Sequence, residues 1–476
     1  MLFSSIPFLY YFLPAVMGLY FLVPKGLKNT VLLVFSLLFY AWGEPRYVAL
    51  MIFSILLFYG CGLAIGVSET LKGKKFWLTV SVVSSLSLLA IFKYADFFLS
   101  SVNEMTGLSL PMLKLALPIG ISFYTFQCLS YTIDVYRGTV PVQKNVISFG
   151  AYVSLFPQLI AGPIVRYVDV ARELDQRQTT GEDLAYGLRR FLVGLGKKVL
   201  LANQFGQFIE VFRSTTEPST LFYWLYAVSF MLHIYFDFSG YSDMAIGLGR
   251  IFGFHFIENF DYPYLSKSVA EFWRRWHISL GSWFRDYVYI PMGGNRVSKG
   301  RWIFNIFTVW MLTGFWHGAS WNFVLWGLYF ALFLLLEKFV FRWQKHGNAF
   351  TVHLRRLYTL IVVWFGWFLF RFDDMGLMGH ALKSLFGGYQ GFNGDNAHYT
   401  LKSYLFILLV AMIACTPIIP FFAKKLTAAA EQESALGGLA RAVTNTVAVA
   451  APIALLILSA LALVGDSYNP FLYFRF

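Results

Sequence analysis

His317 is the titratable residue that stands out most in this sequence, because it lies within a long apolar run. The run is WMLTGFWHGASWNFVLWG, residues 310–327, in which Gly314 and Gly318 flank the imidazole. Small neighbours let a substrate or another backbone approach closely. A neutral imidazole here is suited to take the proton from a hydroxyl that attacks an activated acyl carbon, which typically contributes about 10²–10⁴-fold in rate. The alternative is a buried neutral histidine that is hydrogen-bonded to a neighbouring helix.

A second polar group occupies residues 271–296, whose sequence is EFWRRWHISLGSWFRDYVYIPMGGNR. His277 is accompanied there by cations, carboxylates and tryptophans, namely Arg274, Arg275, Arg285, Glu271, Asp286, Trp273, Trp276 and Trp283. One interpretation is an amphipathic interfacial helix whose arginines reach lipid phosphates. The other is a partly buried polar wall in which Arg274 and Arg275 bind an anionic cosubstrate, such as a phosphate-bearing thioester carrier.

Two carboxylates, Asp237 and Asp243, fall in a run of aromatic and small residues. They are candidates for a proton path, which would favour a transporter, or for scaffold residues that bind Arg or Tyr neighbours. We favour the scaffold, because the surrounding Gly and Ser residues suit close helix packing. The three cysteines, Cys61, Cys128 and Cys415, lack metal-like spacing and are interpreted as packing residues. The sequence supports no bound cofactor and no metal site.

Membrane helices are the elements that must position these residues. The chain has 476 residues, of which 58% are hydrophobic and 13% charged, whereas soluble proteins are about a quarter charged. Apolar runs of near-spanning length begin near Ile6, Thr30, Tyr47, Phe76, Pro111, Leu221, Ile303, Trp321, Leu354, Leu401 and Val443. Residues 146–165, 186–212 and 268–290 are more ambiguous, and the last carries too many charges to face lipid throughout. We therefore predict an all-α polytopic membrane protein with about 11 transmembrane helices plus re-entrant or interfacial helices around a central tunnel.

The net charge of +13 lies in short basic clusters between the apolar runs, a pattern that indicates cytoplasmic loops rather than nucleic-acid binding. The clusters are Lys25 and Lys28; Lys72, Lys74 and Lys75; Lys345, Arg355 and Arg356; and Lys424 and Lys425. If they are cytoplasmic, both termini are extracytoplasmic. The first apolar run lacks a basic segment before it, so we expect a retained helix rather than a signal peptide. We predict a single membrane domain over 1–476, with N-terminal helices in 1–110, a catalytic core in 111–372, and C-terminal helices and an aromatic tail in 373–476.

Several sequence blocks, in order along most of the chain, carry a family resemblance. They are MLFSSIPFLYYFLP, LLVFSLLFYAWGEP, LPIGISFYTFQCLSYTIDVYRG, LFPQLIAGPIVR, YFDFSGYSDMAIGLGRIFGF, the block from Glu258 to Arg296, and GFWHGASWNFVLWG. The chain thereby resembles the membrane-bound O-acyltransferase family, in the bacterial branch that O-acetylates alginate, peptidoglycan and other exopolysaccharides. The resemblance implies that His317 is the essential residue and that His277 lines the same tunnel. It also implies a bacterial cytoplasmic membrane, acetyl-CoA as the cytoplasmic acyl donor, and an acceptor that comes from the opposite face.

The same resemblance suggests an acyl relay and a partner. The chain ends in NPFLYFRF, and Tyr473 in this tail is either an acyl relay or part of an aromatic interfacial anchor. An extracytoplasmic SGNH-type acetyltransferase is the expected partner, besides membrane lipid. The alginate proteins often have a further histidine after the last motif, where this chain reads WGLYFALF, so the acceptor polymer stays open. The rival functions are D-alanyl transfer from an acyl carrier protein toward teichoic acid, a lipid or polysaccharide transporter, and a structural scaffold for polymer export.

Overall fold

The protein is described here by a computed structural model that covers residues 1–476, apart from 161, 216–218, 342–347, 388–394, 466–467 and 470–476. The described residues form twenty α-helices with short π- and 3-10-helical segments. They contain no β-strand, and a single bridge pairs Phe260 with Trp276. The prediction of an all-α membrane protein is confirmed.

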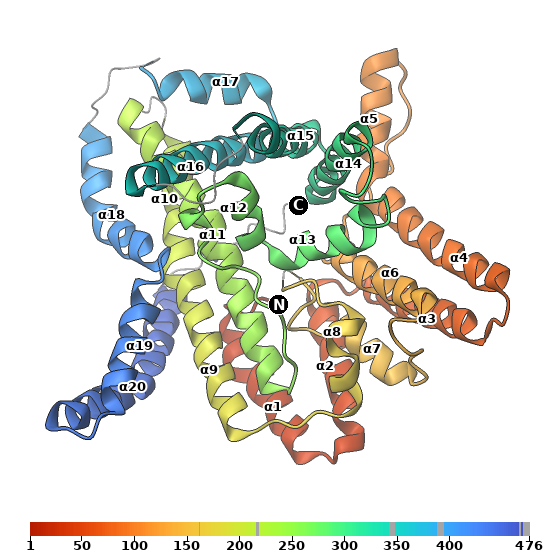
Figure 1. Cartoon of the computed structure of the whole chain (residues 1–476), viewed down its shortest axis with the longest axis horizontal. Helices are drawn as coiled ribbons and strands as arrows, with labels where there is room; N and C mark the ends of the chain where they lie inside the picture. The colour runs from red at the N-terminus through yellow and green to blue at the C-terminus, as the bar shows by residue number, and fades with distance from the viewer. Residues whose placement is uncertain (161, 216–218, 342–347, 388–394, 466–467, 470–476) are drawn as a thin grey trace.

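The N-terminal part consists of α-helices, some of which continue into one another through π-helical segments. A π-helical turn, Phe8–Phe12, runs into α1, and four further helices follow: α1 Leu13–Leu22, α2 Lys28–Gly43, α3 Val48–Val67, α4 Leu71–Leu89 and α5 Ala95–Thr106. A π-helical segment, Ala90–Tyr94, joins α4 to α5. Helices α3, α4 and α5 extend from one edge of the molecule (Figure 1).

The apolar run that begins near Pro111 departs from the expected span. Residues 111–118 are not helical, and the next helix, α6 Ile121–Arg137, begins after Gly120. Pro111 and Pro118 lack the backbone N–H that a helix interior requires, and Gly120 has a φ of +75°. Most of α6 is buried within the protein, including the polar side chains of Gln127 and Asp134. This run therefore supplies an internal helix rather than a lipid-facing one.

The centre of the molecule is built on two long helices that pack together closely. They are α9 Gly181–Gly196 and α11 Thr220–Ile251. A Cβ atom on Gly187 would lie 2.7 Å from the carbonyl oxygen of Gly247, and one on Gly194 would lie 2.5 Å from that of Gly240. Small residues at such positions let membrane helices approach without a side chain between them. The remaining helices of this region are α7 Val146–Ser154, α8 Tyr167–Asp175 and α10 Asn203–Ser214, with a π-helical segment, Lys197–Ala202, between α9 and α10.

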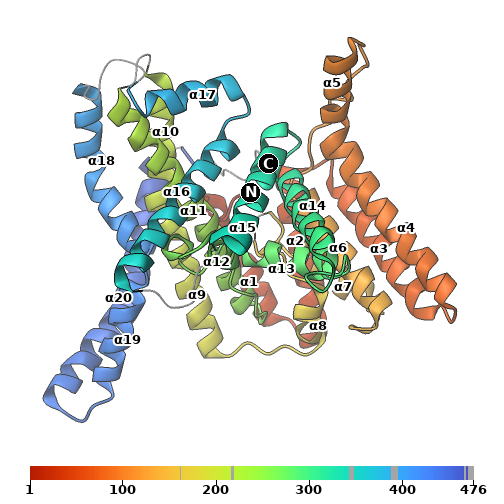
Figure 2. The same ribbon diagram turned by 45° about the horizontal axis from the view of Figure 1, so that its top comes forward.

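The segment with many charges folds as short pieces rather than as one helix. It contains α12 Val269–Arg275, α13 Ile278–Phe284 and a π-helical turn, Arg285–Tyr289. Figures 1 and 2 place α12 and α13 in the interior, between α11 and the next helices. Their aromatic side chains, such as Phe272 and Trp276, are buried. Non-helical backbone is tolerated at membrane depth where it is buried in protein, as it is here.

The helices that follow carry the His317 motif and the C-terminal part. They are α14 Lys299–His317, α15 Trp321–Leu336, α16 Ala349–Arg371, α17 Met375–Ser384, α18 Asp395–Ala414, α19 Ile418–Ala430 and α20 Ala435–Gly465. Helices α14 and α15 cross where Gly314 faces Gly327, and a Cβ on Gly314 would lie 2.1 Å from the carbonyl oxygen of Phe323. Helices α19 and α20 form a hairpin that projects from the edge opposite α3 and α4 (Figures 1 and 2).

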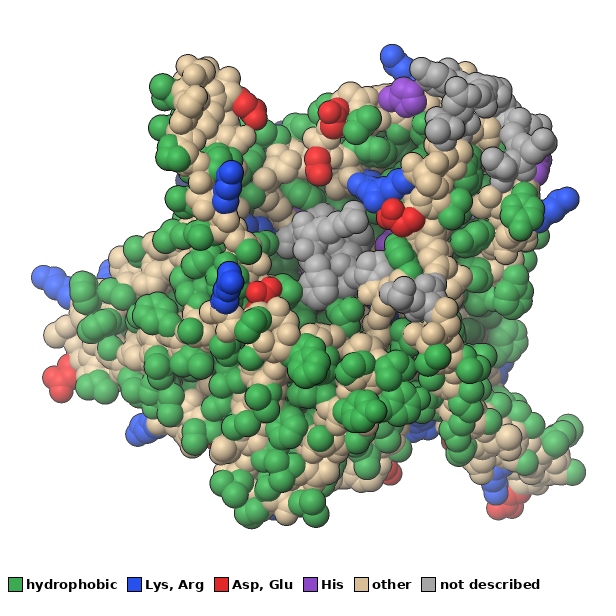
Figure 3. All heavy atoms as spheres, turned by 180° about the vertical axis from the view of Figure 1, so that it is seen from behind, with side chains coloured by type: hydrophobic (Ala, Val, Ile, Leu, Met, Phe, Trp, Pro, Cys, Tyr) green, Lys and Arg blue, Asp and Glu red, His purple; other side chains and the backbone are tan. Residues whose placement is uncertain are grey.

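Seven helical stretches among the described residues are long and apolar enough to cross a membrane. They are Lys25–Gly43, Val48–Val67, Leu71–Thr106, Thr220–Ile251, Trp321–Phe341, Ala397–Ala414 and Ala435–Gly465. The run near Ile6 is shorter, over Phe8–Leu22, while those near Ile303 and Leu354 coincide with α14 and α16. Hydrophobic side chains predominate on the face seen in Figure 3, as expected for a surface in contact with lipid.

Candidate active site

His317 is the last residue of α14 and lies in an aromatic enclosure. Its ring packs edge-on against Trp316, Trp326 and Phe370, at centroid distances of 5.0, 5.1 and 5.3 Å. The side chain is 5% exposed. Gly318 then takes up an extended conformation and ends the helix, so the motif turns sharply into α15. The sequence therefore positions the imidazole at a helix terminus, directly before the short turn into α15.

Two adjoining cavities reach this enclosure. A small one, of about 70 Å³, is lined by His317, Trp316 and the irregular segment before α6. A larger one, of about 520 Å³, is lined by the Gly318–Ser320 turn, Phe370 and the ends of α5 and α16. Both are lined by Lys93 and Leu117. A reactant near His317 would thus have space on one side for an acyl group and on the other for a larger acceptor.

Lys93 is a functional candidate that the sequence reasoning missed. It lies in the π-helical segment between α4 and α5, and its Nζ donates hydrogen bonds to the carbonyl of Trp316 and to Ser122 Oγ, the latter at 3.3 Å. It also lies 5.7 Å from the centre of the Trp316 ring. In the described part of the chain no carboxylate is within ion-pairing distance of this ammonium. The available signal was a lone lysine inside an apolar stretch, which in a membrane segment is a functional suspect by default.

His277 occupies a strained backbone position beside the same tryptophan. It has a φ of +47°, a left-handed conformation that non-glycine residues seldom adopt outside functional or tightly determined sites. Its ring lies 6.0 Å from that of Trp316 and 4.6 Å from that of Phe238, both edge-on. The fold therefore brings His277 and His317 to the same aromatic side chain, although 39 sequence positions separate the two histidines.

Asn259 fixes the orientation of the His277 ring. Its Oδ1 accepts from the backbone N–H of Ser279 at 3.2 Å and from the Ser279 hydroxyl at 2.9 Å, which identifies that atom as the oxygen. The same Oδ1 lies 3.2 Å from His277 Nδ1, so Nδ1 carries the proton of the neutral ring. His277 Nε2 is then the basic nitrogen; it is buried and has no hydrogen-bond partner among the described residues. His277 itself lines neither of the two cavities.

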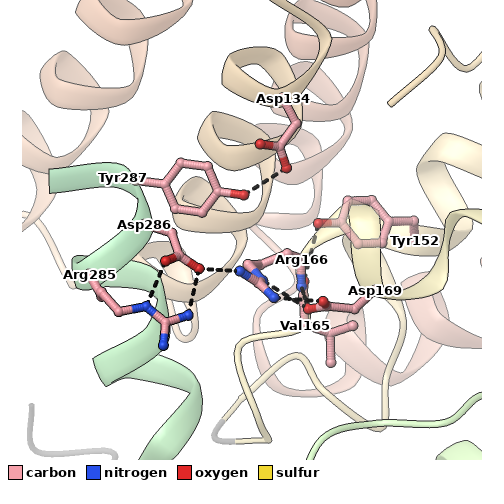
Figure 4. Close-up of polar contacts among 8 residues, drawn as sticks. All are labelled: Asp134, Tyr152, Val165, Arg166, Asp169, Arg285, Asp286 and Tyr287. Atoms are coloured by element: carbon pink, nitrogen blue, oxygen red, sulfur yellow. Dashed lines mark hydrogen bonds and ion pairs between the residues drawn. The ribbon is translucent and has the colours of Figure 1, made fainter. Parts of the chain in front are cut away.

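A polar network anchors the chain segment that follows His277 (Figure 4). Arg166 forms ion pairs with Asp169 at 2.8 Å and with Asp286 at 2.7 Å, and Asp286 also pairs with Arg285 at 2.7 Å. Tyr287 donates to Asp134 at 2.6 Å. These contacts join the π-helical turn after α13 to α6 and α8. Arg285 and Asp286 thus hold the segment in place rather than face the cavities.

The other predicted residues lie at different places. Arg274 is exposed, and Arg275 forms ion pairs with Glu271 at 2.9 Å and with Asp261 at 3.5 Å. Neither arginine lines the two cavities beside His317. Their role in binding the donor stays a prediction, which the geometry does not favour. Tyr473 lies outside the described residues.

The two membrane carboxylates are ion-paired. Asp243 contacts Arg190 and Lys197, each at 2.6 Å, while Asp237 contacts Lys198 at 2.5 Å. These pairs tie α11 to α9 and to the π-helical segment after it, which is the geometry of a scaffold. Cys61, Cys128 and Cys415 are free and buried, in keeping with a packing role.

The fold and the buried histidines define a polytopic membrane enzyme, and the comparisons with known proteins place it in a family. The sequence model of the membrane-bound O-acyltransferase family matches residues 79–378. The probable alginate O-acetylase of Azotobacter vinelandii is 38% identical, with all of both chains covered. The peptidoglycan O-acetyltransferase of Helicobacter pylori is 32% identical over 81% of this chain and 80% of its own. The teichoic acid D-alanyltransferase of Bacillus subtilis is 30% identical over 53% of this chain and 68% of its own.

This chain belongs to the membrane-bound O-acyltransferase family. The resemblance seen in the sequence blocks is confirmed, and so is the predicted enzyme class, an O-acetyltransferase. The matched region, 79–378, contains Lys93, Asn259, His277 and His317.

Proposed function

We propose that the protein transfers an acetyl group from cytoplasmic acetyl-CoA, across the membrane, for O-acetylation of a cell-surface or secreted polysaccharide. The observation that carries this proposal is the buried His317, which closes a small cavity that adjoins a larger one at Lys93. The relatives named as alginate O-acetylase and peptidoglycan O-acetyltransferase, which align over most or all of the chain, support acetyl as the group and a polysaccharide as the final acceptor.

His317 is the proposed base in this reaction. Its imidazole takes the proton from the acceptor hydroxyl while the hydroxyl oxygen forms a bond to the thioester carbonyl carbon. The carbonyl electron pair moves to oxygen, and the resulting tetrahedral species collapses with cleavage of the carbon–sulfur bond. The imidazolium then gives its proton to the departing thiolate, so that the products are the acetyl ester and free coenzyme A. Lys93, beside the same cavity, supplies a positive charge for the developing oxyanion.

The acetyl group has two possible acceptors inside the protein. In the direct route the hydroxyl belongs to the polymer or to a small glycan. In the relay route it is the phenol of Tyr473, which passes the acetyl group to an extracytoplasmic SGNH-type acetyltransferase. The membrane is proposed to be the bacterial cytoplasmic membrane, with both termini extracytoplasmic, because the basic clusters follow the positive-inside pattern.

Two rivals are weaker on specific grounds. D-alanyl transfer has less support, since the D-alanyltransferase relative aligns with about half of this chain. A transporter that moves protons through Asp237 and Asp243 is disfavoured, because both carboxylates are held in close ion pairs. The structure offers no observation that raises either above acetyl transfer.

Thioester turnover by the purified protein in nanodiscs tests the proposal. With acetyl-labelled acetyl-CoA we expect release of free coenzyme A. If the relay operates, we also expect the label to remain on the wild-type protein and to be absent from Tyr473→Phe. Turnover in Tyr473→Phe with a soluble glycan acceptor would instead favour the direct route. Turnover only with a D-alanyl carrier protein would overturn the acetyl donor, and no use of either thioester would overturn acyl transfer.

A further inference from the structure

A third cavity, whose lining residues lie far from His317 in the sequence, is lined by several cations. It has a volume of about 550 Å³ and lies where the end of α1 and the start of α2 meet the loop between α8 and α9. Four of its lining residues are basic: Lys25, Lys28, Arg172 and Arg177. Asp175 is its single acidic lining residue. The acyl-transfer chemistry proposed above does not use this cavity.

None of the four cations is neutralised by a carboxylate in the described part of the chain. Asp175 forms no ion pair with them, and the neighbouring Glu173 faces His255 instead, at 2.6 Å. Lys28 Nζ lies 4.6 Å from the centre of the Tyr20 ring, and the Arg177 guanidinium lies 5.6 Å from the same centre. Two cations thus share one aromatic ring, where like charges repel each other.

Arg177 is held in place with part of its guanidinium unused. Its Nε donates to the Tyr20 hydroxyl at 2.9 Å, and its Nη1 donates to Asn29 Oδ1 at 2.7 Å. Its Nη2 has no hydrogen-bond partner among the described residues and is closed off from solvent, so this nitrogen does not open onto the cavity. The two hydrogen bonds fix the Arg177 charge at the cavity wall. An anion bound in the cavity would relieve the repulsion between this charge and the neighbouring cations.

The position of the cavity indicates the kind of anion. Lys25 lies shortly after the end of α1 and Lys28 begins α2, so the cavity lies at the ends of two apolar helices. Basic residues at the ends of apolar helices are suited to meet the phosphates of a bilayer. The adjacent side chains of Phe21, Leu22 and Leu27 are exposed and apolar, which suits contact with acyl chains. Lys and Arg together are the usual ligands of phosphate groups, which accept several hydrogen bonds at once.

We propose that this basic cavity is a phosphate-binding site that takes the phosphate ester of an anionic ligand at the membrane surface. The ligand is the headgroup of an anionic phospholipid or the phosphates of a nucleotide such as those on coenzyme A. The coenzyme A source alone rests on the proposed function. The site itself requires only the four cations, their lack of carboxylate partners and the position at the helix ends.

Ligand-dependent thermal stability in detergent tests the proposal. Dioctanoyl phosphatidylglycerol, dioctanoyl phosphatidylcholine and 3′,5′-ADP would each be titrated into the wild type and into Lys28→Gln/Arg172→Gln. The control is Lys72→Gln/Lys75→Gln, which removes two exposed lysines of another basic cluster that does not line this cavity. We expect saturable stabilisation of the wild type and the control, and at least about tenfold weaker binding in the cavity variant.

The ligand that binds identifies the source. Saturation with phosphatidylglycerol but not phosphatidylcholine supports a lipid headgroup, and saturation with 3′,5′-ADP supports the nucleotide. Without ligand, the cavity variant should be at least as stable as the wild type, because it has lost like-charge repulsion. A lower stability of the unliganded cavity variant would indicate that the cations have a purely structural role. Equal ligand binding by the wild type and the cavity variant would overturn the site, and so would an equal loss of binding in the control variant.

Discussion

Replacing Lys93 with methionine separates two roles that its position beside His317 permits. The substitution keeps the length of the apolar stem but removes the ammonium and its hydrogen bonds to the Trp316 carbonyl and to Ser122. A hydrogen bond from a charged donor contributes about 1.5–3 kcal/mol to stability. If Lys93 only supports the end of α14, the variant loses about that much stability and retains most of its kcat.

An electrostatic role gives a different result. Loss of one donor to a developing oxyanion typically lowers kcat about 10²–10³-fold, which is about 2.7–4 kcal/mol of transition-state stabilisation. We predict a fall in kcat of this size for Lys93→Met, little change in KM for acetyl-CoA, and partial recovery in Lys93→Arg. The assay is release of free coenzyme A by protein in nanodiscs, with thermal melting measured on the same samples.

The control for this variant is Lys75→Met, because Lys75 is exposed and lies in the same helical stretch, Leu71–Thr106. We expect wild-type turnover from it. Lys93 has no electrostatic role in catalysis if Lys93→Met retains a kcat within about threefold of the wild type while its melting temperature falls, because that result is expected of a residue that only supports the end of α14.

Three further predictions concern packing, scaffold and the second histidine. Gly314→Ala should lower the stability by about 1–3 kcal/mol, seen as a lower melting temperature, and should reduce turnover, because its Cβ would meet the backbone of α15. The control Gly300→Ala, whose Cβ would point into open space, should change neither. Asp243→Asn should destabilise the protein by about 3 kcal/mol, since Lys197 loses its carboxylate partner and Arg190 keeps only Glu258. The folded fraction should still turn over thioester, and loss of turnover in fully folded protein would revive the proton-path role. His277→Gln should lower kcat by about 10²-fold with the fold intact, and an unchanged kcat would remove His277 from the site.

The sequence was sufficient for the overall architecture because membrane helices have a strong local signal. Ten of the eleven expected starts fall on or beside helices, from the run near Ile6 to the run near Val443. The exception is the run near Pro111, where apolar composition suggested a span and the backbone chemistry of Pro118 and Gly120 delays the helix. Apolar content alone does not distinguish lipid-facing from protein-buried segments.

The site was less predictable because its residues converge only in the tertiary structure. His277 and His317 were both recognised, yet their meeting at Trp316 depends on how the backbone turn at His277 comes to lie beside the end of α14. Lys93 lies outside the sequence blocks of the family resemblance, and Asn259, although inside the block from Glu258 to Arg296, has no chemistry that singles it out. For Arg274 and Arg275 the sequence suggested too much. Their clustered charge indicated an anion-binding site, but Arg274 is exposed and Arg275 is ion-paired.

Thioester turnover by His317→Ala is the most direct test of the catalytic proposal. The matched control is His353→Ala, which removes an exposed histidine of α16. With both variants monodisperse and melting like the wild type, we expect His317→Ala to lose about 10²–10⁴-fold in kcat and His353→Ala to retain wild-type turnover. Wild-type turnover in a folded His317→Ala would contradict the assignment of His317 as the base.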